Sequence, residues 1–109
     1  MHELGIADGI VQICAERAED ARVIRVRVEI GELTAVLPDA LRFCFDVCAR
    51  GTVVEGAVLE IDETPARAVC GHCAREVVLS RPAGRCACGC ANLRVIAGEE
   101  LKVKEMELA

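Results

Sequence analysis

The sequence predicts an α+β protein in which two helices cover a three-stranded sheet and a cysteine-rich module of short strands is inserted before the last strand. Apolar residues recur at three- and four-residue steps in two segments, which is typical of amphipathic helices, and alternate with polar residues in others, which is typical of half-buried strands. Five of the eight cysteines lie between residues 70 and 90. With 109 residues, 53% of them hydrophobic and 28% charged, the chain is too short for a multidomain enzyme and fits one compact body with a small appendage.

The first element is a helix from Glu3 to about Ala18. Its apolar stripe consists of Leu4, Ala7, Ile10, Val11, Cys14 and Ala18. Gly9 lowers the stability of this helix by about 1 kcal/mol relative to alanine, so packing against a sheet must hold it. A strand follows, in which Ile24, Val26, Val28 and Ile30 alternate with Arg25, Arg27 and Glu29.

The second helix begins at Pro38, because proline favours the first helical turn, and Gly51 ends it. Its apolar face carries Leu41, Phe45 and Cys48, with Cys44 beside them. The spacing therefore places this helix, like the first, against the sheet.

Two further strands complete the body. In the first, from Val58 to Asp62, apolar residues alternate with acidic ones. The second covers residues 101–108, where the apolar set shifts from Leu101 and Val103 to Met106 and Leu108. This shift predicts a bulge or a change of burial partner near Lys104.

Charge and composition exclude several classes of partner. A net charge of −5, two Phe and no Trp or Tyr remove both the positive field and the stacking surfaces that nucleic-acid binding requires. No segment approaches the roughly 20 apolar residues of a membrane span, and the start at Met1-His2-Glu3 lacks the basic and apolar regions of a secretory signal. We therefore expect a cytoplasmic protein with neither nucleic acid nor membrane as partner.

The cysteine cluster predicts a metal site. Cys70-Gly-His-Cys73 and Cys86-Ala-Cys88-Gly-Cys90 are separated by twelve residues, and in a reducing compartment such clusters bind metal more often than they form disulfides. Four thiolates around one tetrahedral Zn²⁺ make a closed, structural site. The glycine after Cys88 favours Cys86 and Cys88 as the second pair of ligands, with Cys90 in reserve.

The module between the body strands is thus zinc-ribbon-like, because a segment of about 30 residues with so few apolar side chains needs a cross-link to fold. His72 is interpreted as a turn residue of the first cysteine pair. Cys14, Cys44 and Cys48 lie in apolar patterns, and we expect them to pack in the core.

The N-terminus carries a second candidate metal site. The amine of Met1, the amide nitrogen of His2 and its imidazole Nδ1 can close five- and six-membered chelate rings around one ion, and the Glu3 amide is next in line. Such a planar set of nitrogens suits Ni(II) or Cu(II) and disfavours Zn²⁺. Alternatively, His2 is only a polar residue ahead of a helix, and Glu3 begins that helix with a favourable charge.

Several motifs follow one another over essentially the whole chain. They are Met1-His2-Glu3-Leu4, Ile30-Gly31-Glu32-Leu33, Leu41-Arg-Phe-Cys-Phe-Asp46, the paired cysteines and Gly98-Glu-Glu-Leu-Lys-Val103. In this combination they resemble the HypA family of hydrogenase nickel-incorporation proteins. One departure is the second cysteine pair, which is Cys-x-x-Cys in most of that family and Cys86-x-Cys88, followed by Cys90, in this chain.

The resemblance implies a nickel metallochaperone, not an enzyme, that binds Ni(II) as a transient cargo and delivers it for maturation of [NiFe] hydrogenase and, in some organisms, urease. It implies nickel ligation by His2 with the backbone nitrogens of Met1, His2 and Glu3. It assigns structural Zn(II) to Cys70, Cys73, Cys86 and Cys88. The implied partners are a HypB-type GTPase, which contacts the nickel domain near the first helix, and the precursor of the hydrogenase large subunit.

The change of character between Pro65 and Gly98, with its five cysteines and few apolar residues, predicts a division into domains, and the resemblance gives each its metal. Residues 1–65 and 97–109 form a small nickel-binding domain, and residues 66–96 form the zinc-binding module. We expect a monomer or a weak homodimer.

Two alternatives to metal delivery follow from the cysteines. Their spacing alone allows a zinc-ribbon module that binds protein or nucleic acid, although the charge argues against nucleic acid. A small thiol redox protein using Cys86, Cys88 or Cys90 would need a thiol pKa well below about 8.5.

Overall fold

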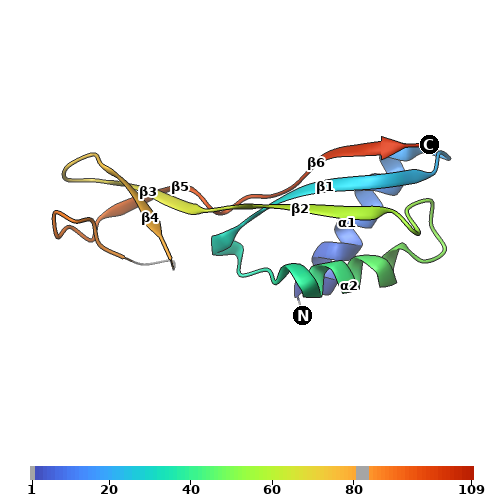
Figure 1. Ribbon diagram of the computed structural model, residues 1–109, viewed down its shortest axis with the longest axis horizontal. Coiled ribbons are helices and arrows are strands. Elements are labelled where there is room, and N and C mark those ends of the chain that lie inside the picture. The colour runs from blue at the N-terminus through green and yellow to red at the C-terminus, as the bar shows by residue number, and fades with distance from the viewer. Residues whose placement is uncertain (1, 81–83) are drawn as a thin grey trace. The chain divides into compact units, whose positions relative to one another are not determined.

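The computed structural model describes residues 2–80 and 84–109. The elements in chain order are α1 (His2–Ala18), β1 (Val23–Gly31), the 3-10 helix η1 (Glu32–Thr34), α2 (Pro38–Ala49), β2 (Val58–Thr64), β3 (Ala66–Cys70), β4 (Glu76–Leu79), β5 (Leu93–Ala97) and β6 (Leu101–Leu108) (Figure 1). The predicted α+β class is confirmed.

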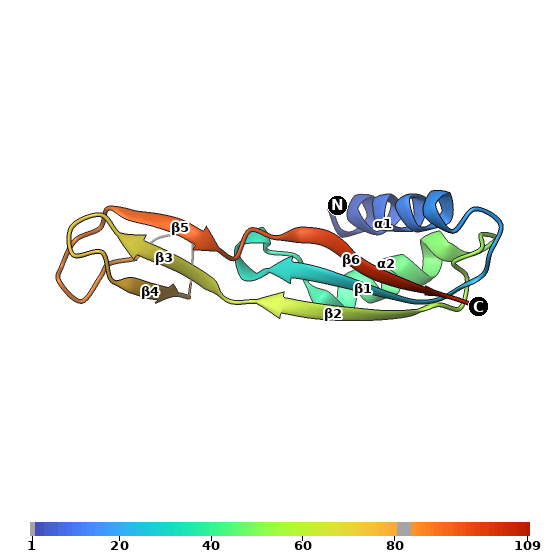
Figure 2. The ribbon, with the colours of Figure 1, turned by 90° about the horizontal axis from the view of Figure 1, so that it is seen from above.

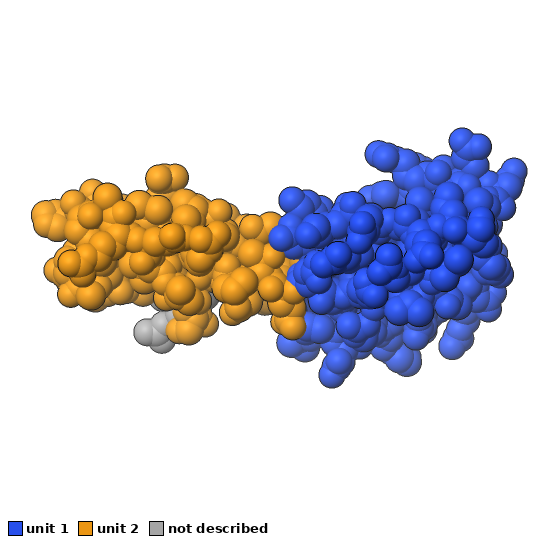
Figure 3. All heavy atoms as spheres, turned by 45° about the horizontal axis from the view of Figure 1, so that its top comes forward, with its two compact units in different colours: residues 1–29, 36–62, 102–109 blue, residues 30–35, 63–101 orange. Residues whose placement is uncertain are grey.

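The chain divides into two compact units, which Figure 3 colours separately. The first contains residues 1–29, 36–62 and 102–109, and the second contains residues 30–35 and 63–101. Residues 30–35, which were expected in the domain formed by residues 1–65 and 97–109, therefore pack with the cysteine-rich unit. None of the helices in the described part of the chain is long and apolar enough to cross a membrane.

The first unit is a sheet in the order β2-β1-β6 with both helices on one face (Figures 1 and 2). Val26 and Val28 of β1 are fully buried under the helices, whereas Arg25 and Arg27 alternate with them on the open face. The helices contribute Ala7, Ile10, Val11, Cys14, Leu41 and Phe45 to the same core. Two helices on a three-stranded sheet were predicted from these patterns, and the prediction is confirmed.

The open face of this sheet carries ion pairs that join all three strands. Arg25 lies 3.1 Å from Glu60 and 3.2 Å from Glu107, and Arg27 lies 2.8 Å from Asp62 and 3.2 Å from Glu105. Each partly exposed pair contributes little free energy by itself. Because each arginine contacts both neighbouring strands, the pairs tie β2, β1 and β6 together on this face.

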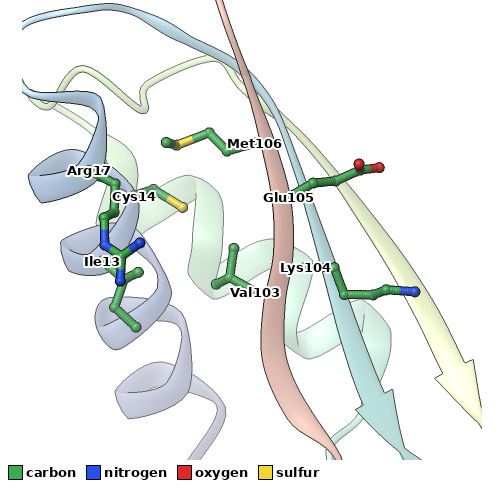
Figure 4. A pocket seen from close by; sticks show the side chains of 7 residues that line it. All are labelled: Ile13, Cys14, Arg17, Val103, Lys104, Glu105 and Met106. Carbon is green, nitrogen blue, oxygen red and sulfur yellow. The ribbon is translucent and has the colours of Figure 1, made fainter.

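The burial of β6 changes phase near Lys104, as the sequence predicts. Lys104 and Glu105 are adjacent in sequence, yet both lie on the side of the strand away from α1 (Figure 4). Lys104 pairs with Asp62 of β2, and Glu105 pairs with Arg27 of β1. The half-buried residues are Val103 and Met106, three positions apart rather than two.

The three cysteines outside the cluster differ in burial. Cys14 is buried with 1% exposure, which confirms its predicted core position. Cys44 and Cys48 are only half-buried, so the prediction of core packing was wrong for them. On α2 the buried line passes through residues 41, 45 and 49 at four-residue steps, and both thiols lie beside this line rather than on it.

The second unit is an antiparallel sheet in the order β4-β3-β5. Its buried core consists of Ala66, Ala68 and Leu79, packed against the half-buried Leu33, Val77, Leu93 and Val95. Two alanines and one leucine bury little apolar area, so a core of this size cannot by itself offset the entropy of ordering the segment. The unit therefore needs a further cross-link.

Candidate metal centres

The strand register brings the two cysteine loops together. Cys70 at the end of β3 is the pairing partner of Leu93 at the start of β5, so the loop that follows β3 and the loop that precedes β5 lie at the same end of the sheet (Figures 1 and 2). As a result, the Sγ atoms of Cys70, Cys73, Cys86 and Cys88 all lie within 4.8 Å of one another. In residues 2–80 and 84–109, no other set of three or more histidine, cysteine or carboxylate ligand atoms gathers as closely.

The spacing of the four sulfurs fits a tetrahedral ion. The Sγ atoms of Cys70 and Cys88 are 3.6 Å apart, and those of Cys73 and Cys86 are 3.4 Å apart. A tetrahedron with Zn–S bonds of about 2.3 Å has edges of about 3.8 Å. The sulfurs thus stand near the corners of the shell that such an ion would need.

Backbone amides of the first loop point at one of these sulfurs. The amides of His72 and Cys73 lie 3.4 Å and 3.5 Å from Cys70 Sγ, where they stabilise negative charge on the thiolate. The turn is closed by a hydrogen bond of 3.0 Å from the Ala74 amide to the Cys70 carbonyl, with Ala74 in the left-handed region at φ 63°. The imidazole of His72 is not a member of the sulfur cluster, which agrees with its interpretation as a turn residue.

The second loop turns at glycine. The Gly89 amide donates to the Cys86 carbonyl at 2.8 Å, and Gly89 has φ 92°, a conformation that favours glycine. The reserve ligand predicted from the sequence, Cys90, lies outside the cluster. Its carbonyl accepts the Cys86 amide at 2.9 Å, and its Sγ accepts the Asn92 amide at 3.4 Å.

The four neighbouring thiols have different pKa values. The amides of Cys73 and His72 lower the pKa of Cys70 to about 6. At Cys88 the amide of Cys90 acts in the same direction, but burial and hydrogen bonds with the other thiols outweigh it and raise the pKa to about 12. Without a cation the cluster therefore keeps protons, and a divalent ion that binds four thiolates must release them. These residues fit a closed tetrathiolate centre.

The N-terminal candidate lies at the start of α1. The imidazole of His2 is exposed, and its Nε2 atom lies 3.3 Å from Oε2 of Glu3. The same oxygen accepts a hydrogen bond of 3.2 Å from the amide of Leu37. That amide, together with the amide of Glu3 itself, lowers the pKa of the Glu3 carboxyl. Met1 lies outside the described residues.

The burial of Glu3 could not be predicted from the sequence. Glu3 is 7% exposed and Leu4 is 47% exposed, so the first turn presents its acid, rather than its leucine, to the protein. The only local signal was the favourable position of an acid at a helix start. Its partner Leu37 is 34 residues away in the sequence, and no periodic pattern reports such a contact.

Comparison with known proteins places the chain in a family. The family model described as "Hydrogenase/urease nickel incorporation, metallochaperone, hypA" matches residues 1–108. The chain is similar to the hydrogenase maturation factor HypA of a Nostoc species, at 54% identity over 99% of this chain and 96% of that protein. It is also similar to that of Geobacter sulfurreducens, at 48% identity over 99% of both chains.

Two solved structures share the fold. One is the solution structure of the Ni metallochaperone HypA from Helicobacter pylori, with a TM-score of 0.67 and 24% identity over 97% of this chain and 96% of that one. The other is a solution structure of a HypA protein, with a TM-score of 0.71 and 22% identity over 100% of this chain and 97% of that one. At these identities the two structures support the fold alone.

Proposed function

This chain belongs to the HypA family of hydrogenase and urease nickel-incorporation metallochaperones, and from that premise we propose how its two candidate centres divide the work of a nickel metallochaperone in hydrogenase maturation. The N-terminal centre binds nickel as cargo. The tetrathiolate centre binds zinc and holds the second unit together. The single observation that carries the proposal is the family match, which extends over both units and includes the start of α1.

In the nickel centre, the ligands are Nδ1 of His2 and the backbone nitrogens of Met1, His2 and Glu3. Two features of the structure support this set. Because Nε2 of His2 faces the Glu3 carboxylate, Nδ1 is the nitrogen left for the metal. The amides of His2 and Glu3 lie in the first turn of α1, where helix amides have no intrahelical acceptor, so their deprotonation breaks no helix bond.

In the zinc centre, the ligands are Cys70, Cys73, Cys86 and Cys88. A bound Zn²⁺ would supply the cross-link that the small core of the second unit lacks, and four thiolates leave no open position for water or substrate. The centre is therefore structural, and the protein acts by carrying a metal rather than by catalysing a reaction.

We propose a HypB-type GTPase and the precursor of the hydrogenase large subunit as partners, and the cytoplasm as the location, where reduced thiols remain available to zinc. The protein is a monomer or a weak homodimer. A zinc-ribbon module that only binds other macromolecules is not favoured, because the family match covers the helical unit as well as the cysteine-rich one.

The nickel site is tested by titrating Ni(II) into zinc-loaded protein whose chain starts at Met1 without a tag, followed by calorimetry and absorbance. Wild type is expected to bind about one nickel with a diamagnetic, square-planar spectrum, and His2→Ala is expected to lose it. His72→Ala is the matched control, because it removes the other of the two histidines and should bind nickel as wild type does. Equal binding by wild type and His2→Ala would overturn the proposed site.

A further inference from the structure

A groove runs between α1 and the edge of the sheet in the first unit. It has a volume of about 260 Å³ and is lined by Ile13, Cys14, Arg17, Val103, Lys104, Glu105 and Met106. Figure 4 shows Val103 and Met106 reaching from β6 toward α1, with Cys14 opposite them, while Lys104 and Glu105 lie on the other side of the strand. The lining of the groove is thus about half apolar and half polar, and Ile13, Cys14, Val103 and Met106 supply its apolar side chains.

One wall of the groove is an edge strand. β6 lies at the end of the order β2-β1-β6 and pairs with β1 alone among the described strands. In an antiparallel pair, alternate residues direct their backbone N–H and C=O groups away from the neighbour. An eight-residue edge of this kind is a template for one more strand, which is how many domains recognise extended peptides.

The other wall of the groove is α1, which carries an arginine. Arg25, Arg27, Lys102 and Lys104 of the sheet all make ion pairs, but Arg17 makes none with any side chain in the described part of the chain. Arg17 lies four residues after Ile13, which is 49% exposed, so the two side chains share one face of α1. The rim of the groove therefore offers an apolar contact and a positive charge one helical turn apart.

The two walls match in spacing. One helical turn is about 5.4 Å, and residues two apart on a strand point to the same side about 6.6–6.8 Å from each other. A strand added to β6 can therefore direct one side chain toward Ile13 and the side chain two residues away toward Arg17. The first must be apolar and the second a carboxylate.

We propose that the groove between α1 and β6 binds an extended segment of a maturation partner by strand addition to β6, with an apolar residue in the groove and an Asp or Glu two positions away on Arg17. This inference deepens the proposed function and rests on it for the identity of the partner. It adds the mode of recognition and the residues responsible.

The test selects phage-displayed dodecapeptides of random sequence on the full-length, zinc-loaded protein, and measures the affinity of the selected peptides by fluorescence anisotropy. We expect an apolar residue and an acid two positions apart in the selected sequences. Arg17→Glu should weaken their binding about tenfold, because an attraction becomes a repulsion. The control Arg50→Glu makes the same change of charge at an exposed residue of the same unit and should leave the affinity within twofold.

Two further measurements separate strand addition from other modes of binding. Ile13→Lys replaces an exposed side chain of the groove and should also lower the affinity for the selected peptides. Bound peptide should slow amide hydrogen exchange in β6 but not in β2. Failure to select any peptide, equal affinities for Arg17→Glu and Arg50→Glu, or binding without protection of β6 would each overturn the docking site. Nickel titration of the same variants distinguishes a failure of the docking site from a failure of the proposed function. A variant that loses peptide binding but still binds nickel has a defect in the groove alone.

Discussion

The carboxylate of Glu3 accepts a hydrogen bond from the backbone amide of Leu37, at 3.2 Å. Glu3 lies in the first turn of α1, and Leu37 is the residue immediately before α2, where no side chain caps the helix. One buried acid thus links the starts of the two helices. Because the same oxygen also lies 3.3 Å from Nε2 of His2, the link extends to the residue proposed to bind nickel.

Removing the carboxylate acceptor of Glu3 should reduce the protection of the backbone amide at the start of α2. In Glu3→Ala the Leu37 amide loses its partner, and we expect its hydrogen exchange to become about tenfold faster or more. Glu3→Gln keeps a carbonyl oxygen that can accept the same bond, so its exchange should stay close to that of wild type. NMR exchange rates at Leu37 in the three proteins check this, and equal rates in all three would show that the hydrogen bond does not protect the amide.

The contrast between Glu3 and the strands shows what the sequence can predict. The alternation through Val26 and Val28 follows from the local geometry of a strand, so a window of a few residues is enough to predict it. The grouping of the cysteines can likewise be predicted from their spacing. The Glu3–Leu37 contact and the half-burial of Cys48, whose Sγ lies 4.0 Å from the Leu4 carbonyl oxygen, depend on how α1 and α2 pack. Side chains far apart in the sequence determine that packing, and no local period encodes it.

The choice between Cys88 and Cys90 as zinc ligand can be tested by parallel substitutions. Cys88 Sγ lies 3.6 Å from Cys70 Sγ, whereas Cys90 Sγ accepts the Asn92 amide outside the cluster. Cys88→Ser should therefore weaken zinc binding by about 100-fold or more, since a thiolate is lost from the shell, and Cys90→Ser should change it less than threefold. Competition with a chromophoric chelator measures both affinities. The reverse order would make Cys90 the fourth ligand.

The buried thiol of Cys14 should make the protein less stable in alkali. Burial raises the pKa of Cys14 above its ordinary value of 9.0, so the thiol stays protonated in the folded state while the unfolded chain ionises. Stability from this group is therefore complete below pH 9.0 and is lost as the pH rises above that value.

Urea unfolding of wild type and Cys14→Ala at about pH 8 and about pH 10 checks this pH dependence. At the lower pH, Cys14→Ala should be less stable by about 1–2 kcal/mol because it leaves a small cavity. At the higher pH the difference should shrink, because only wild type carries the thiol. A constant difference would mean that Cys14 ionises alike in both states. The other thiols are present in both proteins and cancel in the comparison.

Two glycine-to-alanine substitutions should change stability in opposite directions. A Cβ on Gly31 would lie 2.1 Å from the carbonyl carbon and oxygen of Gly98, in the segment where the Leu33 amide donates to that carbonyl at 2.7 Å. Backbone atoms cannot move aside as a flexible side chain can, so Gly31→Ala should lower the stability of the second unit by about 2–3 kcal/mol. A Cβ on Gly9 of α1 meets nothing within 4 Å, so Gly9→Ala should raise the stability of the first unit by about 1 kcal/mol through helix propensity alone.

Amide exchange separates the two effects within the zinc-loaded protein. Gly31→Ala should speed the exchange of Leu33 and of the β3 amides, while Gly9→Ala should slow exchange in α1, so each substitution reports on its own unit. If the Leu33 amide stays protected in Gly31→Ala, the chain segments at Gly31 and Gly98 can move apart without breaking their hydrogen bond. The close contact between the two glycines is then not required for stability. If Gly9→Ala destabilises α1, the helix face at Gly9 must have a contact that alanine disturbs, because propensity and space both favour the substitution.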